Sequence, residues 1–542
     1  MTVLRNLYHL TRADFLERVR RASFLIVLVS TLIAGYLFVP PVGAGYRVLE
    51  VGSHRGIYNS EWIGLMFGLI AALHLSLIGF FLVKNAVQRD HQTGVGQIIA
   101  TTPISKLTYV FGKWLSNLAV LIVILSVMTI IAMTMQLVRA EEHAIHFWAL
   151  ATPIWLMGLP VLGIAAALAV LFECTSFLKG GLGNVVFLFL WLLVLGLVMT
   201  SAINQETEKA RQISDPYGYT RQLVDIQDQV LAVDPNADLS SGLLIITEDE
   251  DTFVWEGIQW TMRILLERLM WVGLALVLVV GASIPFDRFD PAQRRAKSER
   301  TDLRSRLKDQ FDGGHRMPKL STDAPAASIA KLTPLDIPTG GGRFLGVFFA
   351  ELKLMFKGPK LIWYIVLLGI NIACLLNPSD PVQPFILMVV WIWPIAVWSQ
   401  MGAREHRHNT WQIIFCAPRP ALRQLPAMWL AGVVVAVIAG SGAWLYIALS
   451  GEMAMLFAWF GGALFVPALA LALGVWAGSS RVFEAIYLFI WYLGLVEGVP
   501  VLDFAGTTST SLAMGIPYVY LLISACLVGL ALFGRIIQSR RS

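Results

Sequence analysis

Residues 62–83 read WIGLMFGLIAALHLSLIGFFLV, a run of 22 residues in which His74 is the one ionisable side chain. A helix needs roughly 20 residues to cross about 30 Å of hydrocarbon, so this run predicts a membrane-spanning helix. Eleven further segments qualify, some of them only marginally. The twelve predicted spans are 23–39, 62–83, 112–137, 147–172, 184–202, 265–284, 360–376, 384–402, 427–449, 454–476, 482–499 and 517–534.

The composition also predicts a membrane protein. The chain has 542 residues, of which 56% are hydrophobic and 14% are charged, whereas a soluble domain usually carries about 25% charged residues. That shortfall is too large for a big core alone, so lipid must cover much of the surface. The net charge of +5 falls in stripes between apolar blocks, which indicates membrane topology and not nucleic-acid binding. We therefore predict an all-α integral membrane protein.

The loops predict an orientation. Lys and Arg side chains gather at both chain ends and in the loops after the second and eighth spans, whereas most of the alternate loops lean acidic, as at Glu141 and Glu142. Loops rich in Lys and Arg stay on the cytoplasmic side. Both termini are therefore predicted to be cytoplasmic.

Two long hydrophilic segments interrupt the spans. Residues 203–260 hold twelve acids against three Lys or Arg, which predicts an extracytoplasmic loop in which Gly242–Thr247 is a candidate strand. Residues 286–342 are rich in Arg, Asp and Pro and cannot bury enough apolar surface to fold alone, so they are predicted to form a cytoplasmic linker. This linker divides the chain into six-span halves, 1–285 and 343–542.

The two halves resemble each other in sequence. At an offset of 315 residues, eight of the 26 positions from 89 to 114 are identical to their counterparts, and most of these are polar, Pro or Trp residues. A second alignment pairs residues 188–193 with 488–493. We interpret this as a tandem repeat, with two parallel six-helix units related by an axis along the membrane normal.

Motifs of nucleotide binding and hydrolysis are missing from the sequence. It contains no GxxxxGK[ST], HExxH or GxSxG pattern, so we predict no catalytic residue, no metal site and no cofactor site in this chain. The spans are nearly free of charge at mid-depth, where ion-coupled transporters usually need ionisable groups. His74 is the main candidate there, and a hydrogen bond between helices is its more ordinary role.

The loops after the second and eighth spans carry the most information. Residues 84–106 read KNAVQRDHQTGVGQIIATTPISK. The charged triplet at 89–91 extends the helix out of the membrane, Gly94 and Gly96 permit a turn, Gln97–Ala100 form a short apolar stretch, and Pro103 closes it. Such a segment suits docking into a groove on a partner protein; the alternative is an ordinary positive loop.

From Asp90 through Ile98–Lys106 to Gly112-Lys113, this stretch resembles the signature of type-2 ABC exporter permeases. Residues 4–21 and 344–357 resemble the interfacial connector helices of that family. The resemblance implies a coupling helix at 88–103 and another at 403–418. The residues it implies as contacts with an ATPase are Arg89, Asp90, His91, Gln97, Pro103, Arg404, Glu405, His406, Gln412 and Pro418.

The second half departs from this signature. Asn409-Thr410 stands where the first half has its glycine turn, and residues 416–420 read CAPRP. The resemblance therefore leaves open whether both docking sites are equally competent.

The resemblance also implies a translocation path along the second and fifth spans of each half. The aromatic and polar residues there are Phe67, His74, Trp191, Trp391, Trp393, Trp398 and Trp491. They suit an apolar or amphipathic substrate, although single Trp residues near helix ends also belong to the interfacial belt of membrane proteins.

Together these features predict the permease subunit of an exporter in the inner membrane of a bacterium. Two copies of a separate cytoplasmic ATPase, carrying ATP and Mg, would energise it. One alternative is an ion-coupled secondary transporter of 6+6 topology, which also has parallel halves. A second is a membrane-embedded enzyme or assembly factor that uses residues 203–260.

Overall fold

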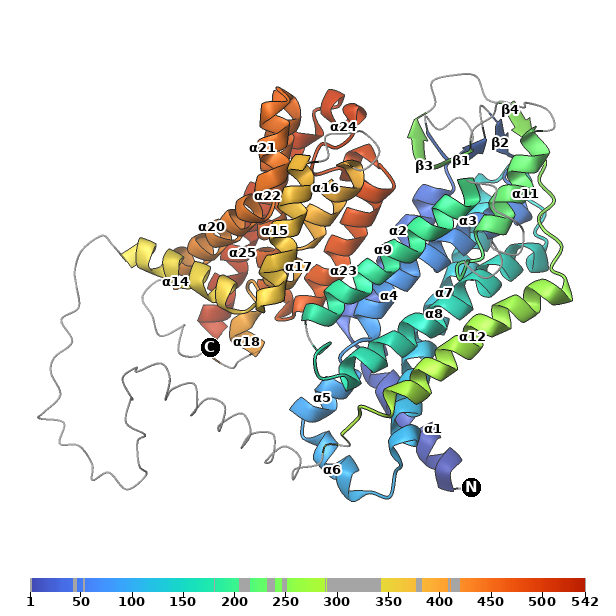
Figure 1. The fold of residues 1–542 in the computed structure, drawn as a ribbon, viewed down its shortest axis with the longest axis horizontal. Helices are drawn as coiled ribbons and strands as arrows, with labels where there is room; N and C mark the ends of the chain where they lie inside the picture. Colours follow the sequence, from blue (N-terminus) through green and yellow to red (C-terminus); the bar gives the residue numbers. More distant parts are fainter. Residues whose placement is uncertain are drawn as a thin grey trace, which may run out of the picture.

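The computed structural model describes residues 2–41, 46–51, 54–179, 181–203, 215–231, 239–245, 251–287, 289, 343–376, 383–407, 410 and 420–541. The predicted linker lies almost wholly outside these residues. The two halves form two helical bodies that stand side by side (Figure 1). The first body carries a small sheet at one end, here called the sheet end, and a short helical hairpin at the other, here called the hairpin end (Figure 1).

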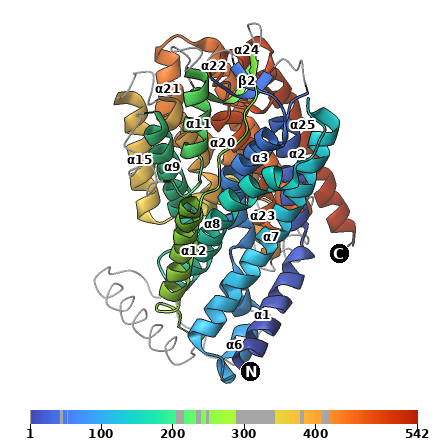
Figure 2. The ribbon, with the colours of Figure 1, turned by 90° about the vertical axis from the view of Figure 1, so that its right-hand side faces the viewer.

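The first half is built from long helices, and shorter ones lie at its two ends. In chain order they are α1 (Thr2–Val19), α2 (Ala22–Phe38), α3 (Ser60–Leu69), the π-helix η1 (Ile70–Leu75), α4 (Ser76–Val83), α5 (Ala86–Gln92), α6 (Val95–Thr101), α7 (Lys106–Arg139), α8 (Phe147–Cys174), α9 (Gly181–Ile203), α11 (Thr220–Leu231) and α12 (Met262–Ala282). Helix α1 lies along the hairpin end of α7 (Figure 2).

The second half has a similar order of helices. They are α14 (Arg343–Lys357), α15 (Leu361–Leu376), α16 (Gln383–Ile392), α17 (Ile395–Trp398), α18 (Arg404–Arg407), α20 (Pro420–Ala439), α21 (Ser441–Leu449), α22 (Met453–Ala477), α23 (Ser480–Trp491), the π-helix η3 (Tyr492–Val496), the 3-10 turn η4 (Pro500–Leu502), α24 (Ser509–Ala513) and α25 (Ile516–Arg541).

Each of the twelve predicted spans contains helix, but they are not equally complete. Within the described residues, seven helices are long and apolar enough to cross a membrane, and two bent pairs bring the number to nine. The bent pairs are α1 with α2, at 68°, and α14 with α15, at 95°, which are the predicted connector helices with the spans that follow them. The eighth span is interrupted at Pro394 and the ninth at Gly440, where the regular hydrogen-bond ladder of a helix breaks.

A small sheet covers the sheet end of the first half, and the all-α prediction missed it. The strands are β1 (Tyr46–Val51), β2 (His54–Gly56), β3 (Leu239–Ile245) and β4 (Asp251–Phe253), in the order β3-β1-β2-β4. β1 is antiparallel to β2 and β3, and β2 is parallel to β4. β3 overlaps the predicted strand at 242–247, whose last two residues lie outside the described ones. The sequence gave no sign that its partner is the loop after the first span.

The two halves meet mainly through α23, which packs against α2 and α4 of the first half. Many apolar side chains stay exposed on the outer helices, such as Leu266 and Val277 on α12. Apolar exposure on this scale is expected where lipid covers a protein. The fold is therefore that of a multi-pass membrane protein with a seam between two helical halves.

Candidate functional site

The loop after the second span folds into the hairpin of α5 and α6. Asn85, at φ 69°, precedes α5, and Gly94, at φ 79°, joins the two helices. Left-handed backbone of this kind favours Gly and Asn, which explains the turn predicted at Gly94. On α6 the side chain of Ile99 is buried, whereas Val95 and Ile98 are exposed, Ile98 at 67%. The hairpin thus presents an apolar strip to solvent at the end of the molecule.

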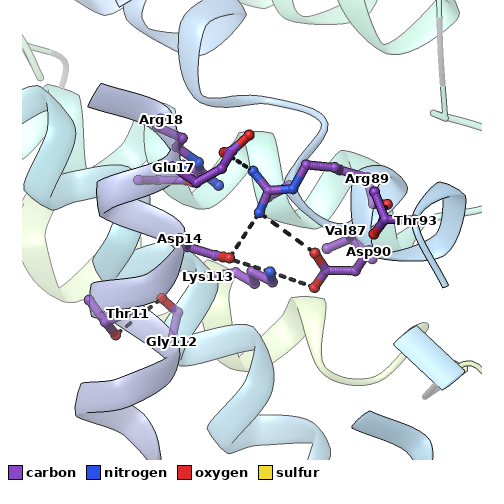
Figure 3. A network of polar contacts seen from close by, with 12 residues as sticks. Thr11, Asp14, Glu17, Arg18, Val87, Arg89, Asp90, Thr93, Gly112 and Lys113 are labelled. Carbon is purple, nitrogen blue, oxygen red and sulfur yellow. Dashed lines mark hydrogen bonds and ion pairs between the residues drawn. The ribbon is translucent and has the colours of Figure 1, made fainter. Parts of the chain in front are cut away.

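An ion network fixes the inner side of this hairpin (Figure 3). The carboxylate of Asp14 on α1 lies 2.9 Å from an Arg89 guanidinium nitrogen and 2.6 Å from Lys113 Nζ. Lys113 Nζ also lies 2.5 Å from a carboxylate oxygen of Asp90, and Arg89 makes a second pair with Glu17. The network joins the three elements α1, α5 and α7.

Asp90 lies inside this network and not on its surface. Its side chain is in a residue that is 3% exposed, and it accepts a hydrogen bond of 2.7 Å from the hydroxyl of Tyr109. Lys113 is completely buried, so Asp90 and Asp14 together neutralise a charge that would otherwise be costly. Of the predicted contact residues in the first half, His91, Gln97 and Pro103 are exposed, Arg89 is half-buried and Asp90 is buried.

A second anchor comes from Glu173 at the end of α8. One carboxylate oxygen accepts the N–H of Ala86 at 3.0 Å, and the other accepts those of Val87 at 2.6 Å and Gln88 at 3.1 Å. These are donors that the first turn of a helix leaves without intrahelical partners. A carboxylate there satisfies them and interacts favourably with the helix dipole. Sequence reasoning missed Glu173, whose only signal was a single acid near the end of an apolar span.

The second half repeats the central contact with different chemistry. At the offset of 315 residues Tyr109 corresponds to Gln424, and Gln424 Nε2 donates to Glu405 at 2.8 Å as Tyr109 does to Asp90. Likewise Arg404 lies 3.1 Å from Glu351 on α14, as Arg89 does from the acid on α1.

The buried cation differs between the halves. Lys113 corresponds to Met428 at the same offset, and Arg535 from α25 instead lies 3.4 Å from Glu405. Glu405 is buried, and His406 lines a polar cavity of about 300 Å³ at the hairpin end of the seam. Gln412 and Pro418, the remaining predicted contacts, lie outside the described residues.

The seam brings together some of the residues predicted for a translocation path. The ring of His74, on the π-helix η1, lies 5.3 Å from that of Phe489 and 5.6 Å from that of Tyr492. Trp191 lies 6.0 Å from Tyr492 and donates to Ser76 Oγ at 3.1 Å. Both nitrogens of His74 are buried without a hydrogen-bond partner among the described residues. Phe489 and Tyr492 were not predicted.

The other predicted path residues contact their own half. Phe67 packs toward Gly35 on α2, Trp391 stacks with Trp459, Trp398 donates to the carbonyl of Gly432, and Trp491 donates to that of Met388. Trp393 is an exception, since its ring lies 5.7 Å from Phe189 of the first half.

A lysine closes the hairpin end of the seam. Lys84, which follows α4, donates to Asn184 on α9 and lies 3.9 Å from Glu484 on α23. These two partners are 300 residues apart, the same offset that relates Trp191 to Trp491. Lys84 therefore contacts corresponding positions of the two halves at once.

Comparison with known families agrees with this architecture. Residues 62–222 match the family described as ABC-2 family transporter protein, and this match includes the second to fifth spans and the α5–α6 hairpin. A comparison with curated proteins finds no match. Over residues 62–222 the chain therefore belongs to the ABC-2 family of transporter membrane proteins, as the motif around Asp90 suggested.

Proposed function

We propose that this chain is the membrane-spanning subunit of an ATP-driven exporter, in which each half is one permease unit. Separate cytoplasmic ATPase subunits, two per chain, would dock at the α5–α6 hairpin and at the corresponding loop after the eighth span. Both termini and the hairpin end would then be cytoplasmic, in a bacterial inner membrane. ATP and Mg would bind to the ATPase.

One observation carries this proposal: the hairpin is held rigidly on its inner side and is apolar on its outer side. Val95 and Ile98 would enter a groove on the partner, flanked by the polar side chains of His91 and Gln97. Helix-in-groove recognition uses apolar anchors of this kind. Asp90 would not touch the ATPase, because it is occupied within the chain; it would hold the hairpin in its docking position.

The duplication supports two docking sites. The contacts of Asp90 and Glu405 with residues at one common offset, and the two arginine–acid pairs to α1 and α14, are what two related units would keep. The difference at Lys113 and Met428 implies that the two sites differ in strength.

The seam supports the path of transport. His74, Trp191 and Tyr492 form an aromatic layer between the halves, and Lys84 lies between this layer and the hairpin end. Separation of the halves there would expose a slot for an apolar or amphipathic substrate. The buried His74 would then gain hydrogen-bond partners that it lacks in the closed seam.

Copurification tests the docking site. The tagged chain would be purified in mild detergent from its native membranes, and the accompanying ATPase would be quantified by mass spectrometry. An Ile98→Arg variant should lose the ATPase that docks at this hairpin, whereas the control Val254→Arg, an exposed apolar residue at the sheet end, should retain it. A chain that arrives alone and still transports under an ion gradient would overturn the proposal in favour of a secondary transporter.

A further inference from the structure

A second cavity lies between the halves, on the lateral side of the seam. It has a volume of about 570 Å³ and is bordered by α9 of the first half and by α14, α15 and α17 of the second. Its walls are largely apolar and include Val186, Phe189, Trp363 and Trp393. This volume lies within the range of pockets that bind small organic ligands.

One end of this cavity is positively charged. Lys179, Lys360 and Arg404 lie on its lining. Arg404 is paired with Glu351, whereas within the part of the chain that the structure describes Lys179 and Lys360 have no carboxylate within ion-pair distance. Lys360 stands at the bend between α14 and α15, where a connector helix turns into a span. A cation at that level meets the headgroups of a bilayer.

The cavity also holds an unused hydrogen-bond donor. Trp363 is only 7% exposed, and its indole N–H has no acceptor among the described residues. A buried donor without a partner costs free energy comparable to a lost hydrogen bond. The lining thus offers cations, one donor and an apolar wall in sequence, which is the polarity profile of an acidic lipid.

The cavity exists because the two sides of the seam differ. On one side α23 of the second half packs directly against α2 of the first. On the other side the corresponding helices, α9 and α15, leave space between them that the cavity occupies. A molecule bound there would contact both halves and would fill the open side of the seam.

We propose that this cavity is a specific binding site for one anionic phospholipid from the membrane leaflet at the hairpin end. Its phosphate lies between Lys179 and Lys360, an ester oxygen accepts the N–H of Trp363, and an acyl chain lies along Phe189 and Trp393. The lipid bridges the two halves and stabilises their present arrangement. This inference requires only that the chain spans a membrane, so it stands or falls independently of ATPase docking.

Native mass spectrometry of the full chain tests this site. The protein is purified in detergent, stripped of lipid and titrated separately with phosphatidylglycerol, phosphatidylcholine and glycerol phosphate. We expect one phosphatidylglycerol to bind in clear preference to phosphatidylcholine, and glycerol phosphate not to bind. A K179E/K360E variant should bind phosphatidylglycerol at least tenfold more weakly, which is the scale of two basic residues near an anionic headgroup.

The matched control carries the same change of charge outside the cavity. Lys353 and Lys357 are exposed on α14 and do not line the cavity, so K353E/K357E should retain full binding. W363F, which removes only the N–H, should weaken binding severalfold without a change in elution volume. Equal binding of the two lipids, equal loss in both lysine variants, or equally tight binding of glycerol phosphate would each overturn the proposal.

Discussion

Replacing Glu173 should release the α5–α6 hairpin from the body of the first half. The three N–H groups that Glu173 accepts belong to consecutive residues, Ala86, Val87 and Gln88, and the first two of these residues are buried. In Glu173→Ala these donors lose their acceptor while the surrounding side chains still exclude water. The perturbation therefore acts at the start of α5 and leaves the exposed strip of α6 chemically unchanged.

The magnitude follows from the number and type of these bonds. A hydrogen bond to a charged group contributes roughly 1.5–3 kcal/mol, and such contributions are not additive. Loss of a helix cap alone costs about 0.5–2 kcal/mol. We take about 3 kcal/mol for the removal of all three, which corresponds to a more than hundredfold increase in the opening of α5. Glu173→Gln keeps one carbonyl oxygen and should give a smaller effect.

Hydrogen exchange of the full chain in detergent measures this opening. Peptides that cover residues 84–92 should exchange about a hundredfold faster in Glu173→Ala, and peptides from the middle of α7 should not change. Glu452→Ala is the matched control, because Glu452 also precedes a helix but makes no side-chain hydrogen bond to its first turn. Unchanged exchange over 84–92 in the Glu173 variants would refute the assignment of Glu173 as the anchor of α5.

Three further predictions concern other parts of the fold. Lys84→Met removes the cation that bridges the two sides of the seam, so spin-label distances across its hairpin end should broaden, whereas in Lys106→Met, an exposed lysine at the same end, they should not. Burial alone would raise the pKa of Glu141, but hydrogen bonds from Arg55 and a backbone N–H outweigh it and hold that pKa below its ordinary value of 4.5; the contact therefore stabilises the fold above about that pH and is lost as the pH falls through the lowered pKa, and in Glu141→Gln the unfolding midpoint should fall less on acidification. Gly402→Ala places a Cβ 2.8 Å from backbone atoms of α22 at a φ of +70°, which should destabilise the second half by about 1–3 kcal/mol and lower its unfolding midpoint; an unchanged midpoint would show that the turn relaxes.

The helices and the hairpin could be predicted from the sequence because their signals are local. Uncharged runs such as 62–83 predict helices, and Gly94 and Pro103 mark a turn and an end within a few residues of each other. The contacts that give the hairpin its position are not local. Asp14 and Lys113 are 99 residues apart, and nothing in the residues around either one indicates the other.

The position of Asp90 shows why the motif was easier to find than its role. An acid in a basic loop outside the membrane is typical of a surface contact, and the sequence contained no evidence against that interpretation. The structure instead surrounds Asp90 with Lys113, Tyr109 and Arg89. The sheet presents the same difficulty, because β1 and β3 are separated by almost 190 residues and pair only once α2 to α9 have folded.

These anchors also determine how a push on the hairpin would travel. Glu173 ties α5 to α8, and the Asp14–Lys113 network ties it to α1 and α7, so the hairpin cannot shift without breaking buried charge contacts or carrying those helices with it. Breaking one partner of a buried ionic network typically costs about 3–5 kcal/mol. Moving the helices as a body costs only the contacts at the seam, where Lys84 meets Glu484 at 3.9 Å and the aromatic layer around His74 makes no hydrogen bond through that ring. The first half is thus strongest beneath the hairpin and weakest at the seam, and a force applied at Val95 and Ile98 would be relieved by separation of the two halves.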